Sequence, residues 1–306
     1  MEYYKLPQSD LTVSRIALGC MRISGKSVEE VEELVKTALD LGINFFDHAD
    51  IYGGGKSEEV FGEVLKRHPE YREKMILQTK CGIVPGKRYD FSKEHILQCV
   101  NDSLKRLNTD HVEILLLHRP DALCDPQEVA EAFDELYQAG KVKYFGVSNH
   151  TPLQIELLKK YSKYPLIINQ LQLSIVHSVM IDSGLNMNMK EAFAQDKDGG
   201  VLDYCRLNDI TIQPWSSIQA SWAEGTFIDH PDYQKLNNVM QELASKYHVT
   251  KPTIAIAWLL RHPAKMQPIV GTTSPIHLKE MSEACKIQLT RQEWYDLYLA
   301  SDKPLP

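Results

Sequence analysis

Short apolar runs alternate with amphipathic stretches along nearly the whole chain. After each run, apolar residues recur three to four positions apart, which is the spacing of one helix face. The segment 28–39 shows this spacing, and Ser27 and Glu30 form a capping box at its start. Asp125-Pro126 supplies an N-cap and a first-turn proline for a later helix. The apolar runs predict eight strands, at 16–20, 44–47, 75–81, 112–117, 144–147, 167–173, 211–215 and 266–271.

Eight strand–helix units predict a parallel sheet with helices outside it. The run 112–117 (VEILLL) is nearly all apolar, as in a strand that is buried on both faces. Eight units in about 300 residues favour a closed (β/α)8 TIM barrel of the α/β class over an open doubly wound sheet. The segments 3–6 and 11–14 predict an N-terminal β-hairpin that caps the lower end of the barrel. No linker or low-complexity tract interrupts the pattern, so we expect one domain over 1–306.

Two segments lack a clear period. The stretch 176–200 contains three Met and two Gly near its end, and 219–233 contains Trp222 and Phe227. Loops of this length are usually functional or mobile, so we expect both to be loops of that kind.

Composition and charge narrow the class of protein. The chain has 306 residues, 43% hydrophobic and 25% charged, with a net charge of −7 and no basic stripe, which disfavours nucleic-acid partners. No stretch reaches the roughly 18 apolar residues of a membrane span, and the first ten residues lack a secretory signal. The six cysteines are dispersed, which favours reduced thiols and argues against a metal site. We therefore expect a soluble, cytoplasmic protein that does not bind metal, nucleic acid or membrane.

Polar residues gather at the carboxyl ends of three successive predicted strands. In a barrel of this kind the active site forms at those ends. Asp47 follows the second strand, Lys80 the third and His118 the fourth, and Tyr52 lies five residues beyond Asp47. A phenol has a pKa near 10, so a tyrosine that donates a proton benefits from a cation that stabilises its phenolate. Lys80 is a candidate for that cation, held by Asp47, and His118 can orient a carbonyl oxygen or relay the proton.

Each of these residues alone has an ordinary structural explanation. A single Asp or Lys at a strand end is usually a loop residue or a surface ion pair, and a single His after a buried strand is usually a core residue. Tyr52, next to three glycines, can be a packing aromatic. Their joint occurrence on three neighbouring strands favours a catalytic site.

The same residues make the sequence resemble the aldo-keto reductases. The segment 45–53 (FFDHADIYG) is similar to the family signature, and TK at 79–80, LLH at 116–118, GVSN at 146–149 and NQ at 169–170 follow in the family's order. The resemblance covers roughly residues 4–287. It implies that Asp47, Tyr52, Lys80 and His118 form the catalytic tetrad of a carbonyl reductase, with Tyr52 as the general acid.

The resemblance also implies a nicotinamide cofactor. Ser148, Asn149 and Gln170 match the residues that hold the nicotinamide carboxamide, Trp215 matches the aromatic that stacks on the ring, and Ser216 and Ser217 match small residues at the pyrophosphate. The adenosine 2′-phosphate is expected at the last helix, next to Gly271, Thr272, Thr273, His277 and Lys279. Gly271 replaces a frequent Lys and His277 a frequent Arg, so we expect NADPH and leave NADH open.

The substrate is expected to be a small carbonyl compound. Candidates for the pocket wall are Met21, Arg22, Trp222 and Phe227. Two other functions stay open at this point. One is a nucleotide-binding regulatory subunit like the potassium-channel β subunits of the same family, with little turnover. The other is a Schiff-base aldolase that uses Lys80 as a nucleophile, although Asp47 is expected to raise the pKa of that lysine. The sequence does not predict an oligomeric state.

Overall fold

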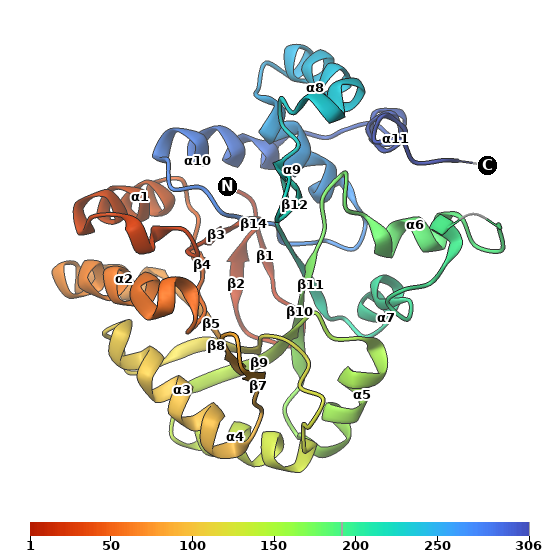
Figure 1. The fold of residues 1–306 in the computed structure, drawn as a ribbon. Helices are drawn as coiled ribbons and strands as arrows, with labels where there is room; N and C mark the ends of the chain where they lie inside the picture. Colours follow the sequence, from red (N-terminus) through yellow and green to blue (C-terminus); the bar gives the residue numbers. More distant parts are fainter. Residues whose placement is uncertain (191, 306) are drawn as a thin grey trace.

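Eight parallel strands form one sheet that curls into a nearly closed barrel (Figure 1). The computed structural model describes residues 1–190 and 192–305. Strand order in the sheet follows the chain, and the last strand lies beside the first. The predicted TIM barrel is therefore confirmed. The strands are β3 (Ala17–Gly19), β4 (Phe45–Asp47), β5 (Ile76–Cys81), β8 (Val112–Leu117), β9 (Val142–Ser148), β10 (Leu166–Gln172), β11 (Thr211–Trp215) and β14 (Ile269–Val270).

The barrel closes between β11 and β14 without a regular ladder: just before β14, the amide of Gln267 donates to the carbonyl of Ile212 at 3.0 Å. On the other side, the amide of Ala17 on β3 donates to the carbonyl of Pro268 at 3.0 Å. Pro268 has no N–H of its own, so it cannot donate a ladder hydrogen bond back to β3. This explains why β14 is shorter than the predicted strand 266–271.

Helices surround the barrel on its outer face (Figure 1). Ser27 and Glu30 form the expected capping box, and the Asp125 side chain accepts a hydrogen bond from the amide of Gln127. No helix in the described residues is both long and apolar enough to cross a membrane. The helices are α1 (Val28–Asp40), α2 (Lys56–Arg67), α3 (Lys93–Arg106), α4 (Pro126–Gln138), α5 (Pro152–Tyr161), α7 (Val201–Leu207), α8 (Gln234–Tyr247), α9 (Lys251–Arg261), α10 (Pro275–Ser282) and α11 (Arg291–Ala300).

The expected hairpin closes the lower end of the barrel. Strands β1 (Tyr3–Lys5) and β2 (Thr12–Ser14) pair antiparallel. Leu6, Leu11 and Val13 are buried, and they pack on apolar side chains from the strands: Ala17, Phe45, Ile76, Ile114, Leu116, Ile167, Ile168 and Ile269. This apolar plug leaves the upper end, where the strands finish, for polar chemistry.

The two aperiodic segments contain more structure than expected. The described part of 176–200 includes the helix α6 (Val179–Leu185), which is only seven residues long and therefore too short to show a helical period. Lys303 near the C-terminus donates to the carbonyl of Ile175 and holds the start of this segment. The segment 219–233 includes a small hairpin of β12 (Gln219–Ser221) and β13 (Gly225–Thr226). A further hairpin, of β6 (Ile83–Val84) and β7 (Arg88–Tyr89), follows β5.

Candidate active site

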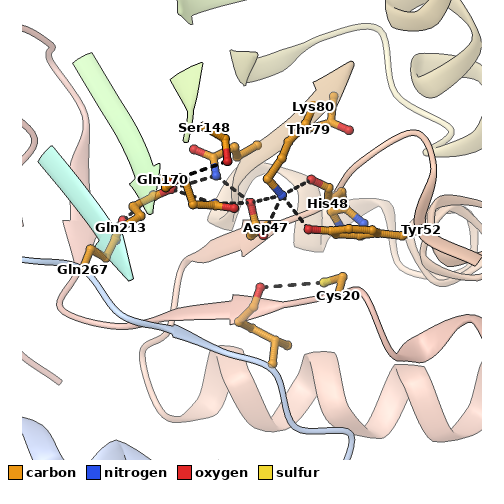
Figure 2. Close-up of polar contacts among 12 residues, drawn as sticks. Cys20, Asp47, His48, Tyr52, Thr79, Lys80, Ser148, Gln170, Gln213 and Gln267 are labelled. Carbon is orange, nitrogen blue, oxygen red and sulfur yellow. Dashed lines mark hydrogen bonds and ion pairs between the residues drawn. The ribbon is translucent and has the colours of Figure 1, made fainter. Parts of the chain in front are cut away.

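A buried lysine organises the upper end of the barrel. Lys80 on β5 has no exposed surface, and its ammonium group contacts the Asp47 carboxylate at 2.8 and 2.9 Å. It also donates to the backbone carbonyl of His48 at 2.8 Å and to the hydroxyl of Tyr52 at 2.9 Å. An ammonium group has three hydrogens, and here each has an acceptor. Figure 2 shows Lys80 at the centre of these contacts.

Three glycines directly after Tyr52 form the turn between β4 and α2 on which the tyrosine lies. After β4 the chain turns sharply into α2, and Gly53, Gly54 and Gly55 have φ values of 60°, 67° and 95°. These left-handed conformations strain residues that have a Cβ. At Gly53 a Cβ would also lie 2.3 Å from the Cβ of Ser24. The turn that places the tyrosine therefore requires glycine.

Burial keeps the hydroxyl of Tyr52 protonated. Burial raises the pKa of Tyr52 above its ordinary value of 10.0, although the positive charge of Lys80 lowers it. Burial thus outweighs the positive charge of Lys80. The hydroxyl accepts a hydrogen bond from Lys80 and donates to no other group in residues 1–190 and 192–305. Its own proton is consequently free for a bound molecule.

His118 is neutral at physiological pH. Burial, with the positive charges of Lys80 and Arg119, holds the pKa of His118 well below 6.5. Its ring lies edge-on to that of Tyr52, with centroids 6.0 Å apart. A neutral imidazole donates one N–H. His118 can therefore hold an oxygen atom next to Tyr52, but it is not a source of acid.

Asp50, another strand-end carboxyl, lies behind the site. Its amide donates to the carbonyl of Lys80 at 3.1 Å, and its Oδ1 is buried with no hydrogen-bond partner among the described residues. Burial raises the pKa of Asp50 to about 7; the charge of Glu58 adds to this, while Cys99 and Arg106 oppose it. This carboxyl is therefore mainly neutral below pH 7.

Asp50→Asn is expected to stabilise the protein at high pH and to have less effect at low pH. The pKa of Asp50 is raised in the folded state from 3.8 to about 7, so the wild type loses stability as pH rises through this window. The amide carries no such charge. Thermal unfolding at about pH 5 and about pH 8 measures the change in Tm. The exposed Asp40→Asn on α1 is the matched control. Equal Tm differences at both pH values would show that Asp50 is not the titrating group.

The residues that are expected to hold the nicotinamide are hydrogen-bonded to one another. The Oδ1 of Asn149 accepts from the indole N–H of Trp215 at 3.2 Å, and its Nδ2 donates to the hydroxyl of Ser148 at 2.8 Å. Gln170 donates through Nε2 to Asp47 at 2.9 Å, and within the described chain nothing donates to its Oε1. Asn149 retains one N–H and Gln170 one acceptor. One donor and one acceptor are what a carboxamide needs, so these residues fit a nicotinamide.

Ser216 and Ser217 lie at the closing seam of the barrel. Ser216 has φ 55° and donates to the Oε1 of Gln219 at 3.0 Å. The hydroxyl of Ser217 is buried and contacts the carbonyls of Pro214 and Ile269 at 3.1 and 3.3 Å. The hydroxyl of Ser217 thus links β11 to β14. Since this hydroxyl is already used, the expected contacts of this segment with a pyrophosphate would come from backbone amides.

The expected 2′-phosphate residues surround the start of α10. Ser274 caps this helix by accepting from the amide of His277, and the hydroxyl of Thr272 accepts from the amide of Ser274 at 3.1 Å. Thr273 is half-buried, whereas Gly271, His277 and Lys279 are exposed. Helix N-termini favour anions, and His277 and Lys279 add basic side chains next to this one.

The expected pocket wall needs one correction. Phe227 has no exposed surface and packs in the core, with its ring edge-on to Tyr233 at 6.4 Å. It therefore lines no open pocket, and the prediction is wrong for this residue. Trp222 is 69% exposed at the turn of the β12–β13 hairpin. Met21 is half-buried and Arg22 exposed after β3.

Sequence reasoning missed several residues at the site. The guanidinium of Arg119 lies 5.9 Å from the centre of the Trp215 ring, and its charge lowers the pKa of His118. Three buried glutamines, Gln78, Gln213 and Gln267, lie inside the barrel. For two of them, the sequence carries a signal in the two-residue repeat of a β-strand, in which every second side chain points to the same face. Gln78 and Gln213 each stand two positions before a site residue, Lys80 or Trp215, and so face the same interior.

Comparison with known proteins agrees with this geometry. A family model described as the aldo/keto reductase family matches residues 15–298. Oxidoreductase YdhF of Escherichia coli (strain K12) is 34% identical over 94% of this chain and 93% of its own. A 6-dehydroglucose reductase of Agrobacterium fabrum is 34% identical over 94% of each chain. The crystal structure of the thermostable aldo-keto reductase Tm1743 with the inhibitor epalrestat superposes with a TM-score of 0.78 and 26% identity, covering 98% of this chain and all of that one.

Proposed function

Because this chain belongs to the aldo/keto reductase family of NAD(P)H-dependent oxidoreductases, we propose that it uses NADPH to reduce an aldehyde or ketone to an alcohol. In this proposal Tyr52 is the general acid. The observation that carries it is the 2.9 Å hydrogen bond from the buried ammonium of Lys80 to the hydroxyl of Tyr52. That contact leaves the proton of Tyr52 available to a carbonyl oxygen.

Each side chain of the proposed tetrad has a separate role in protonating the carbonyl oxygen. Tyr52 and the neutral His118 both donate hydrogen bonds to its oxygen. As the proton leaves Tyr52, the hydrogen bond from Lys80 joins a cation to an anion and becomes stronger. Asp47 keeps Lys80 charged and fixed in place. A bound reduced nicotinamide supplies the hydride to the carbonyl carbon.

The state of Lys80 argues against the aldolase alternative. Burial alone would lower the pKa of Lys80, but Asp47 and Tyr52 outweigh burial and the pKa is raised. A Schiff-base lysine needs a free amine, whereas all three hydrogens of this ammonium have acceptors. Borohydride in the presence of an aldehyde should leave Lys80 unlabelled.

Turnover assays separate the reductase from the regulatory-subunit alternative. Loss of the absorbance of NADPH on addition of aldehydes supports the reductase. Tight NADPH binding with no turnover on any aldehyde supports the regulatory subunit.

Two relatives that are 34% identical carry the name 6-dehydroglucose reductase. We therefore propose a sugar aldehyde as the first substrate to test. We also propose a cytoplasmic location, since all six cysteines are free in the described structure.

Gly271→Lys is expected to tighten NADPH binding and to leave NADH binding unchanged. A Cβ at Gly271 meets no described atom within 4 Å, and its φ is not in the left-handed region. The lysine therefore adds a cation next to the start of α10, where the 2′-phosphate is proposed to bind. One added hydrogen bond corresponds to a roughly 3- to 10-fold lower Kd.

Quenching of Trp215 fluorescence on titration with each cofactor measures this change. Gly271→Glu is the matched control, because it places a negative charge at the same point and should weaken NADPH binding only. If both variants bind NADPH as the wild type does, the 2′-phosphate lies elsewhere.

A further inference from the structure

A chain of buried amides runs down the barrel interior from Asp47. Gln78 is on β5, Gln170 on β10, Gln213 on β11 and Gln267 just before β14, and none is more than 2% exposed. Figure 2 shows Gln170, Gln213 and Gln267 following one another away from Asp47. The lower part of the same interior is filled by apolar side chains. The glutamines therefore form a polar layer between that plug and the proposed catalytic residues.

Two of the amides and two acceptors form a closed ring. The Nε2 of Gln78 donates to the Oδ1 of Asp47 at 2.6 Å and to the Oε1 of Gln213 at 2.9 Å. The Nε2 of Gln170 donates to the same two oxygens at 2.9 and 3.1 Å. Both hydrogens of each NH2 group are thus used, one on Asp47 and one on Gln213.

The charge of Asp47 fixes the direction of the whole chain. An ionised carboxylate only accepts hydrogen bonds, so Gln78 and Gln170 must both turn their NH2 groups toward it. Gln213 must then present its oxygen to them, and its Nε2 donates to the Oε1 of Gln267 at 2.8 Å. Gln267 in turn donates to the carbonyl of Ser14 at 2.7 Å. Flipping any one amide would set two donors or two acceptors against each other.

Gln78 contributes most directly to this arrangement. Its Oε1 is buried and has no hydrogen-bond partner within the described ranges. An unsatisfied buried oxygen lowers stability. An apolar residue at position 78 would avoid that loss, so the presence of glutamine there needs another explanation. The compensating contact is the 2.6 Å hydrogen bond to Asp47, which is shorter than the other bonds in the ring.

We propose that Gln78 and Gln213 are positioning residues for the proton donor. Gln78 donates to one oxygen of Asp47 from below, and Gln213 orients the amide of Gln78 by accepting its second hydrogen. The carboxylate then faces Lys80, and the third hydrogen of Lys80 faces Tyr52. Neither residue contacts substrate or cofactor in this account. The inference rests on the proposed function, because it concerns the efficiency of Tyr52 as an acid.

Gln78→Met tests this inference. The variant keeps the volume of the side chain and removes the donor to Asp47. We expect kcat to fall roughly 10- to 100-fold, as for the loss of a hydrogen bond to a charged group. The Kd of NADPH, read from Trp215 quenching, should stay within about 2-fold, because Gln78 lies below the cofactor residues. Gln267→Met, the same change at the far end of the chain, should lower kcat by less than about 3-fold.

Gln78→Glu adds a pH readout. A neutral carboxylic acid at this position can donate to Asp47, but a carboxylate cannot. The variant should therefore approach wild-type kcat at low pH and lose it as pH rises, at pH values where the wild type is constant. This comparison also carries the test if Gln78→Met does not fold.

Three outcomes would overturn the inference: wild-type kcat in Gln78→Met, an equal loss in Gln267→Met, or a wild-type pH profile in Gln78→Glu. Failure of the proposed function is distinct, because the wild type itself would then reduce no aldehyde.

Discussion

Tyr52→Phe is expected to lower the turnover of carbonyl reduction by roughly 10³-fold, within the range for loss of a general acid. The phenylalanine fills the same space but has no proton to donate. In the wild type, the hydroxyl accepts from Lys80 at 2.9 Å and its own hydrogen is free for the substrate. Binding of NADPH should change little, because Tyr52 is not among the residues proposed to hold the cofactor.

Single-turnover kinetics with saturating NADPH and an aldehyde measure this effect. Tyr4→Phe is a matched control, since it removes another buried tyrosine hydroxyl, one without a hydrogen-bond partner in the described structure and at the opposite end of the barrel. Tyr4→Phe should turn over like the wild type. A Tyr52→Phe variant within about 3-fold of the wild type would remove Tyr52 from the role of acid.

Lys80→Met is expected to abolish turnover and to lower the free energy of unfolding by about 3–5 kcal/mol. Lys80 has no exposed surface and Asp47 is only 2% exposed, so removing the lysine leaves a buried carboxylate without its counter-ion. Two amide donors, from Gln78 and Gln170, remain on that carboxylate. They compensate for part of the lost charge pairing.

A second variant separates stability from catalysis. Asp47→Asn combined with Lys80→Met removes both charges, so the double variant should be more stable than Lys80→Met alone and equally inactive. Urea unfolding monitored by tryptophan fluorescence gives the free energies. If Lys80→Met unfolds like the wild type, the Lys80–Asp47 pair is not the buried ion pair that this account requires.

The gathering of the proposed catalytic residues could be predicted from the sequence because parallel strands end at the same edge of a barrel. Asp47, Lys80 and His118 each follow an apolar run, and their convergence needs only the correct strand count. The N-terminal hairpin was predictable for a similar reason, since two short segments precede the first strand. The lower plug then follows from their buried leucines and valine.

The glutamine network was not predictable by the same reasoning. On β5 all six residues are buried on one face of the strand or the other. Apolar alternation therefore does not reveal that Gln78 faces inward. Only the two-residue spacing to Lys80 carries that information, and it becomes meaningful once Lys80 is placed. The prediction for Phe227 was wrong for a different reason. An aromatic residue in an aperiodic segment suggests a pocket wall, but this segment packs Phe227 into the core.

The direction of the pKa shift of Tyr52 could not be predicted from the sequence either. The sequence shows a lysine that can lie near the phenol, but it does not show how much water surrounds either group. Burial raises the pKa of Tyr52 despite Lys80, and it lowers the pKa of His118 together with Lys80 and Arg119. These directions favour a protonated phenol and a neutral imidazole, as the proposed roles of Tyr52 and His118 require.

Isotope transfer tests the central claim most directly. The purified protein is incubated with a sugar aldehyde or an aromatic aldehyde and with NADPH that carries deuterium at both C4 positions, and the alcohol is examined by mass spectrometry and NMR. We expect one deuterium on the carbon that was the carbonyl carbon, and a rate that falls with Tyr52→Phe. An alcohol without deuterium at that carbon, or no alcohol from any aldehyde despite bound NADPH, would contradict it.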